Sequence, residues 1–241
     1  HFQPIIDLKT DKITSVEALA RWKHPELGNI PPNQFIPIAE STHLIHQLGM
    51  KIFSLAFEAY ARWNQKMIGM EKINLAINMS VKQFEHYSVV DDIKNCAEKN
   101  NFPLDRLHIE ITESIFMDYS RKNQQVIEEL NSIGVTITID DFGTGYSSLN
   151  YLNQFAINAV KIDKSMISEI SGNSKCQYIV ESMVNLAQKM KLSIVAEGIE
   201  DEEQLQVLQR LNCQQGQGFY FCRPLSEEDV CASLAVLDEA E

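Results

Sequence analysis

The chain has 241 residues, of which 44% are hydrophobic, so it can bury a sizeable core and is not a disordered protein. Its net charge is −12 and it has no basic block, which argues against binding to a DNA or RNA polymer. The five cysteines form no CxxC pair and no apolar run approaches the length of a membrane span, so we expect neither a zinc motif nor a membrane contact from this chain.

Short β-rich runs alternate with helical patterns along the chain, which begins in a strand-like segment. This alternation is typical of an α/β protein with a largely parallel sheet wrapped in helices, and the number of strands favours a closed (β/α)8 barrel. Because no linker or repeat interrupts the pattern, we expect one domain over residues 1–241. Strands are predicted over 13–19, 73–80, 107–112, 135–141, 159–163, 192–198 and 218–221, and helices over 44–63, 123–132, 176–190, 202–211 and from 226. Helical patterns also fill residues 81–99.

Polar side chains fall near the ends of six of the predicted strands. A single buried polar group is as well explained by a structural hydrogen bond as by a function. Six strands with this feature favour a shared site, because the carboxyl ends of barrel strands converge on one face. The residues are Glu17, Asn78, Glu110, Asp140, Asp141, Lys161 and Glu197.

The adjacent aspartates Asp140 and Asp141 follow a β-branched strand pattern. On a regular strand they would point to opposite faces, so we expect the strand to stop there and the backbone to turn. Gly143 and Gly145 permit such a turn, because glycine tolerates backbone angles that other residues avoid. The alternative is a polar strand end whose carboxylate caps the loop.

The donor set consists of five carboxylates, one carboxamide and one lysine. Oxygen ligands suit Mg²⁺, Mn²⁺ or Ca²⁺ and argue against zinc or copper. So many carboxylates exceed the need of one cation, and two ions that share Asp140, about 3.5–4 Å apart, are suited to attack of a metal-bound water on a phosphodiester. Lys161 would orient that water or stabilise charge on the phosphate oxygens.

The segment SVEALARW, residues 15–22, resembles the signature of EAL domains, the bacterial cyclic di-GMP phosphodiesterases. The resemblance covers essentially the whole chain, and many segments in the same order make it more specific than one tripeptide. The segments are FQPI at 2–5, EALARWKHP at 17–25, the Asn of INMS, IEITES at 109–114, IDDFGTGYSSLNYL at 139–152, VKID at 160–163, VAEGIE at 195–200 and QGFYFCRP at 217–224.

The resemblance implies a role for each matching residue. The first metal would bind Glu17, Asn78, Glu110 and Asp140, and the second would bind Asp140, Asp141 and Glu197. The residues implied in catalysis are Lys161, Glu197 and Asp141. The implied substrate-binding residues are Gln3, Ala20, Arg21, Asp140, Lys161, Glu197, Gly198, Glu200, Gln217 and Phe219.

The resemblance also implies a modified barrel with one antiparallel strand, and a homodimer. Glu113 would hold the loop of residues 142–149, which links the metal site to the dimer interface. The family usually has tyrosine where this chain has Phe219, so a hydroxyl is lost and an aromatic face remains.

The implied reaction is metal-dependent hydrolysis of cyclic di-GMP to linear pGpG, with two Mg²⁺ or Mn²⁺ per site and inhibition by Ca²⁺. Because the chain starts without Met, we interpret it as a fragment of a longer bacterial protein with an upstream regulatory or GGDEF-type domain. We expect it in the cytoplasm, although the full-length parent can be membrane-anchored.

Two other functions remain open: a cyclic di-GMP receptor without turnover, and a module that signals through its dimer surface. The six histidines are scattered in the sequence and none falls at a strand end of the site. Asp91 and Asp92 begin a predicted helix, where carboxylates interact favourably with the helix dipole, so we expect no second metal site there.

Overall fold

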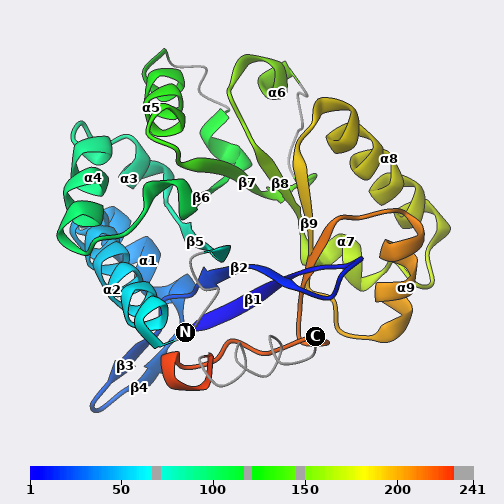
Figure 1. The fold of residues 1–241 in the computed structure, drawn as a ribbon, viewed down its shortest axis with the longest axis horizontal. Helices are drawn as coiled ribbons and strands as arrows, with labels where there is room; N and C mark the ends of the chain where they lie inside the picture. The colour runs from blue at the N-terminus through cyan, green and yellow to red at the C-terminus, as the bar shows by residue number, and fades with distance from the viewer. Residues whose placement is uncertain (67–71, 117–120, 145–149, 231–241) are drawn as a thin grey trace.

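The computed structural model describes residues 1–66, 72–116, 121–144 and 150–230. Its centre is a closed barrel of eight strands in the order β1-β10-β9-β8-β7-β6-β5-β2, with helices around the outside (Figure 1). A hairpin of β3 (Trp22–His24) and β4 (Gly28–Ile30) stands outside the barrel. The barrel strands are β1 (Phe2–Asp7), β2 (Ile13–Ala18), β5 (Asn74–Asn78), β6 (Leu107–Thr112), β7 (Thr136–Phe142), β8 (Ala159–Ile162), β9 (Ser193–Glu197) and β10 (Gln215–Gln217).

Strand β1 runs antiparallel to both of its neighbours, and the other pairs in the barrel are parallel. The connection from β1 to β2 is too short for a crossover helix, so the chain can only reverse direction there. The Asp7 carboxylate fixes this reversal by accepting hydrogen bonds from the backbone N–H groups of Lys9 and Thr10. The expected barrel with one antiparallel strand is therefore confirmed.

The helices lie outside the barrel, and none within the described residues is both long and apolar enough to cross a membrane. Local signals set several of their boundaries. The Asp201 and Gln204 side chains form a capping box at the start of α9, and Asn173 caps α8. The helices are α1 (Pro32–Ser41), α2 (Ile45–Lys66), α3 (Val81–Phe84), α4 (Val89–Lys99), α5 (Arg121–Ser132), α6 (Asn150–Gln154), α7 (Lys164–Ser168), α8 (Ser174–Met190) and α9 (Glu202–Arg210), with 3-10 turns η2 (Leu104–Arg106) and η3 (Glu113–Phe116).

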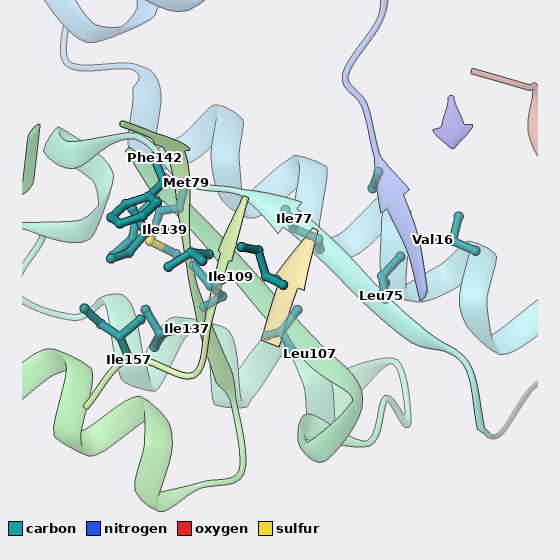
Figure 2. Close-up of a cluster of buried hydrophobic side chains, with 14 of the residues drawn as sticks. Val16, Leu75, Ile77, Met79, Leu107, Ile109, Ile137, Ile139, Phe142 and Ile157 are labelled. Carbon is teal, nitrogen blue, oxygen red and sulfur yellow. The ribbon is translucent and has the colours of Figure 1, made fainter. Parts of the chain in front are cut away.

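The hydrophobic core lies largely between the barrel and the helices. Figure 2 shows buried side chains of neighbouring strands packed together, among them Ile77, Ile109 and Ile137, each at most 1% exposed. Because successive side chains of a strand point to opposite faces, the isoleucines on either side of Glu110 direct that carboxylate to the opposite face, into the barrel. The apolar packing thus fixes which polar side chains point inward.

The predicted strand at 218–221 is wrong, since the last barrel strand is β10 and the aromatic segment after it forms a turn. The backbone N–H of Tyr220 bonds the carbonyl of Ile199, and the N–H of Phe221 bonds the carbonyl of Gly218. Aromatic residues favour strands in general, but these turn outward, with Phe219 45% exposed. The other predicted strands and helices are present with shifted ends, except that the helical stretch at 81–99 is two helices, α3 and α4, and that the helix from 226 is described only to Val230.

Candidate active site

Lys161, on β8, is the centre of the polar cluster and is 1% exposed. Its Nζ lies 2.5 Å from Glu197 Oε1 on β9 and 2.9 Å from Glu110 Oε2 on β6. Glu17 Oε2 on β2 is 3.4 Å away and Asp140 Oδ1 on β7 is 4.0 Å away. Carboxylates from four strands therefore surround one ammonium group inside the barrel.

Three amide side chains extend the cluster around Glu17. Asn78 Nδ2 donates to Glu17 Oε1 at 2.6 Å, and Gln217 Nε2 donates to Glu17 Oε2 at 2.7 Å. Gln217 also lies 3.3 Å from Gln3, which in turn donates to the carbonyl of Cys222. This chain of hydrogen bonds positions Glu17 and links β1, β2, β5 and β10 at the site.

The charges in the cluster do not balance, because four carboxylates face one lysine. Burial raises the pKa of Glu110 well above its usual value, and the charge of Glu17 adds to the effect. Burial also raises the pKa of Glu197 to about 7, in spite of Lys161. Burial acts in the same direction on Glu17, but Lys161 and the two amide donors outweigh it and lower that pKa. The protein alone therefore leaves an excess of negative charge that added cations would offset.

Lys161 itself stays protonated. Burial disfavours its charge, but the carboxylates of Glu110, Glu17, Glu197 and Asp140 outweigh that cost and raise the pKa of the ammonium well above its usual value. A lysine held in this way is a permanent hydrogen-bond donor and not a base at neutral pH.

The two aspartates reach the site in a different way from the one predicted. The strand does not stop at Asp140, since β7 continues to Phe142, which pairs with Ile162 after an irregularity in the register. The backbone bends at Asp141 itself, whose φ is +56°, and Gly143 follows at +95°. A bulge of this kind redirects side chains without ending the strand. The other predicted turn residue, Gly145, lies outside the described residues.

The bulge separates the surroundings of the two carboxylates. Asp140 faces Lys161 and accepts a hydrogen bond from the backbone N–H of Asp141. Burial, together with the charges of Asp140 and Asp163, raises the pKa of Asp141 to about 6. Asp163 was not among the predicted site residues, although it follows directly on the VKI strand.

A cavity of about 270 Å³ opens next to the cluster. The predicted residues that line it are Gln3, Glu17, Asn78, Asp140, Glu197, Gly198, Glu200, Gln217 and Phe219. Sequence reasoning missed Lys164, whose Nζ lies 2.6 Å from Glu200 Oε1 and 5.7 Å from the Phe219 ring centre. It also missed Arg223, whose guanidinium stacks 4.3 Å from the same ring. Neither cation lies at the end of a predicted strand. Only the position of Lys164 directly after VKID and of Arg223 within FCRP could have indicated that they lie near the site.

Two predicted substrate residues lie elsewhere. Ala20 and Arg21 line a separate, larger cavity of about 830 Å³ between the amino terminus and helices α1 and α2. The Arg21 guanidinium donates to the carbonyl of Ala20. Leu19 lines both cavities, so the two are adjacent, but the structure does not bring Arg21 into the smaller one.

Glu113 lies at the start of η3, and its buried Oε2 has no hydrogen-bond partner among the described residues. The loop that it was predicted to hold covers residues 142–149, of which 145–149 lie outside the described residues. The role of Glu113 therefore stays a prediction.

The cluster fits a hard divalent cation by its donor chemistry. Glu17, Glu110 and Asp140 each place a carboxylate oxygen within 4.0 Å of Lys161 Nζ, and such oxygens are the ligands that Mg²⁺ and Mn²⁺ prefer. The Oε1 atom of Gln217 is buried beside them without a hydrogen-bond partner in the described part of the chain. An oxygen left unsatisfied in an anionic pocket is consistent with a site built for a cation and its waters.

The family model for the EAL domain matches residues 1–224. The chain is 40% identical over 235 residues to the bifunctional diguanylate cyclase/cyclic di-GMP phosphodiesterase MucR of Pseudomonas aeruginosa, covering 98% of this chain and 34% of that protein. A cyclic di-GMP phosphodiesterase of the same organism is 35% identical, covering 95% of this chain and 38% of that protein. The chain thus spans about a third of the length of these relatives.

Among solved structures, the MucR phosphodiesterase in complex with cyclic di-GMP superimposes with a TM-score of 0.90 at 39% identity. The match covers 95% of this chain and 92% of that one.

Proposed function

The chain belongs to the EAL domain family, and from that membership we propose that it hydrolyses one phosphodiester bond of cyclic di-GMP to give linear pGpG. The observation that carries the proposal is the cluster of four carboxylates around Lys161, which opens onto a cavity at the ends of the barrel strands. Relatives named as cyclic di-GMP phosphodiesterases are 35–40% identical over nearly the whole chain.

The proposed metal ligands divide into two sets that share Asp140. Glu17, Asn78, Glu110 and Asp140 hold one divalent cation, and Asp140, Asp141 and Glu197 hold the other. Two such ions supply a strong nucleophile at neutral pH and offset charge on the phosphate. We propose Mg²⁺ or Mn²⁺ as the active ions and Ca²⁺ as an inhibitor, because Ca²⁺ prefers longer bonds and looser coordination.

Lys161 and Glu197 act on the attacking water. The Lys161 ammonium is permanently charged and buried, so it donates a hydrogen bond that fixes the water or a phosphate oxygen in line for attack. The Glu197 side chain lines the cavity and is 20% exposed, compared with 2% for Glu110, so it is the better placed of the two to accept a proton.

The cavity rim supplies the proposed contacts to the dinucleotide. Phe219 offers an exposed aromatic face for a guanine base, and Arg223 lies over the same ring. Lys164 and Arg223 add positive charge beside an otherwise acidic site, which favours the anionic substrate. Gln3, Gln217, Gly198 and Glu200 provide the polar lining, and Ala20 and Arg21 are proposed to contact the substrate beyond it.

The wider setting is also a proposal. We propose that residues 1–241 form one catalytic domain of a longer protein in the bacterial cytoplasm, because related proteins are about three times as long. MucR is described as both a diguanylate cyclase and a phosphodiesterase, which supports an upstream GGDEF-type or other regulatory domain. A homodimer completes the proposed assembly.

The test is incubation of the purified chain with cyclic di-GMP and Mg²⁺ or Mn²⁺, with separation of the products by chromatography and an EDTA control. We expect metal-dependent pGpG from the wild type and from Lys189→Met, which alters an exposed lysine on α8, and none from Lys161→Met. Tight binding of cyclic di-GMP by a dimer that forms no product with either metal would favour the receptor function instead.

A further inference from the structure

A second group of metal-ligating side chains lies outside the barrel, where α2 packs against α3 and α4 (Figure 1). His46 is in the first turn of α2, His86 lies between α3 and α4, and Asp92 is in the first turn of α4. One potential ligand atom from each residue lies within 4.8 Å of the other two. Three segments of the chain therefore bring two imidazoles and a carboxylate close together.

The contacts within this group are close. His46 Nε2 lies 3.0 Å from Asp92 Oδ2, and the rings of His46 and His86 stack with their centres 3.6 Å apart. In a tetrahedral site with bonds of about 2.0–2.2 Å, neighbouring ligand atoms are separated by little more than the His46–Asp92 distance. The two rings are nearly parallel, at 16°, so their nitrogen lone pairs converge only after one ring tilts. His86 lies outside both neighbouring helices, where such a tilt is least restricted.

Ser88 supports the group from the side. Its hydroxyl donates to Asp92 Oδ2 at 2.5 Å and lies 3.0 Å from His86 Nδ1. Because the single hydroxyl proton goes to Asp92, His86 Nδ1 carries its own proton and donates it to Ser88 Oγ. The Nε2 atom of His86 then keeps a free lone pair. Hydrogen bonds of this kind, which set the tautomer of a histidine, are usual around metal-binding imidazoles.

One nitrogen of the group makes no hydrogen bond within the described part of the chain. His46 Nδ1 is buried and has no hydrogen-bond partner among the described residues. A buried polar atom without a partner is destabilising, so the bonds made inside the protein do not fully account for this ring. The fold thus gathers two histidines and leaves part of their bonding capacity unused.

We propose that His46, His86 and Asp92 bind a divalent transition-metal ion of the zinc class, with water completing the coordination. Two imidazoles and one carboxylate suit Zn²⁺ or Co²⁺, whereas Mg²⁺ prefers the oxygen-only donors of the barrel site. The ion would tie the start of α2 to the α3–α4 segment. This site is separate from the proposed catalytic centre and does not depend on the proposed reaction.

The test uses Co²⁺ as a spectroscopic probe. The chain is stripped of metal, saturated with Mg²⁺ and titrated with Co²⁺, without cyclic di-GMP. Tetrahedral Co²⁺ with histidine ligands absorbs visible light far more strongly than Co²⁺ in an octahedral oxygen site. We expect this absorption in the wild type and an increase in Tm when Zn²⁺ is added.

Variants decide whether the signal arises from this group. His86→Gln and Asp92→Asn should each weaken Co²⁺ binding at least about tenfold. Even mutation of residues that only hydrogen-bond to metal ligands typically lowers metal affinity by about that factor, so loss of a ligand should cost no less. His43→Asn is the matched control, because His43 is an exposed histidine close to α2 and asparagine tolerates its positive φ of 59°. Circular dichroism checks that each variant folds. Wild-type affinity and spectrum in both ligand variants would overturn the proposal, as would a signal lost equally in His43→Asn.

Discussion

Replacement of Lys161 by methionine should destabilise the metal-free protein strongly. The side chain is 1% exposed and is the cation beside Glu110 and Glu17, whose side chains are 2% and 8% exposed. Removing one partner of a buried ion pair costs about 3–5 kcal/mol, because the other charge stays buried without compensation. Glu197 and Asp140 are more exposed and add less. We therefore expect the free energy of unfolding in EDTA to fall by about 3–5 kcal/mol, measured by urea denaturation.

Two further measurements test the cause. Without Lys161 the carboxylates have folded-state pKa values raised above those of the unfolded chain, so their protonation stabilises the fold at low pH and this support is lost as the pH rises. The deficit of Lys161→Met should therefore be smaller at pH 5 than at pH 8. Mg²⁺ or Mn²⁺ at about 100 times its Kd for the variant should raise the free energy of unfolding of Lys161→Met by about 2.7 kcal/mol relative to its value in EDTA.

The matched control is Lys164→Met, which removes an exposed lysine paired with Glu200 at the cavity rim. Pairs at such exposure contribute at most about 1 kcal/mol, so this variant should be close to the wild type. If Lys161→Met lost no more than Lys164→Met in EDTA, the carboxylates would not depend on the ammonium, and our account of the cluster would be refuted.

Glu17→Ala should abolish pGpG formation, and turnover near the wild-type rate would remove Glu17 from the site. Asp141→Asn should raise the Mg²⁺ concentration needed for activity, and an unchanged metal titration would contradict the second ion. Ca²⁺ in place of Mg²⁺ should leave binding of cyclic di-GMP and little product, whereas equal rates would argue against the proposed ion specificity. Gly218→Ala should lower the free energy of unfolding by more than about 2 kcal/mol in urea denaturation, because a Cβ there would meet Ile199 O at 2.0 Å. A loss of this size lies in the upper part of the range for single substitutions. Gly172→Ala, with open space around it, should stay within about 0.5 kcal/mol.

The regular elements of the barrel could be predicted because their signals are local. β-branched runs such as the one before Asp140 and amphipathic runs such as α4 are encoded within a few residues. The prediction failed at residues 218–221, where aromatic residues favoured a strand. A hydrogen bond from the backbone N–H of Tyr220 to the carbonyl of Ile199, a residue well before this segment in the sequence, holds the chain in a turn there instead.

The candidate site could also be predicted in part from the sequence, because a barrel places the carboxyl ends of its strands on one face. Polar residues at those ends, such as Glu110 and Lys161, could be grouped without knowledge of any distance. The cavity rim could not be predicted in this way. Lys164 and Arg223 lie after strands, and only the folded chain shows both beside Phe219.

The sequence by itself determined the alternation of strands and helices, the acidic donor set and the family resemblance, since each depends on residue type and order along the chain. Only the tertiary structure decided which charges compensate one another, where β7 bends and which histidines meet. His46 and His86 are 40 residues apart in the sequence and stack in the fold because α2 packs beside α4. Contact between side chains so far apart in the chain requires closure of a long loop, which the packing of the helices holds closed, so no local pattern encodes it.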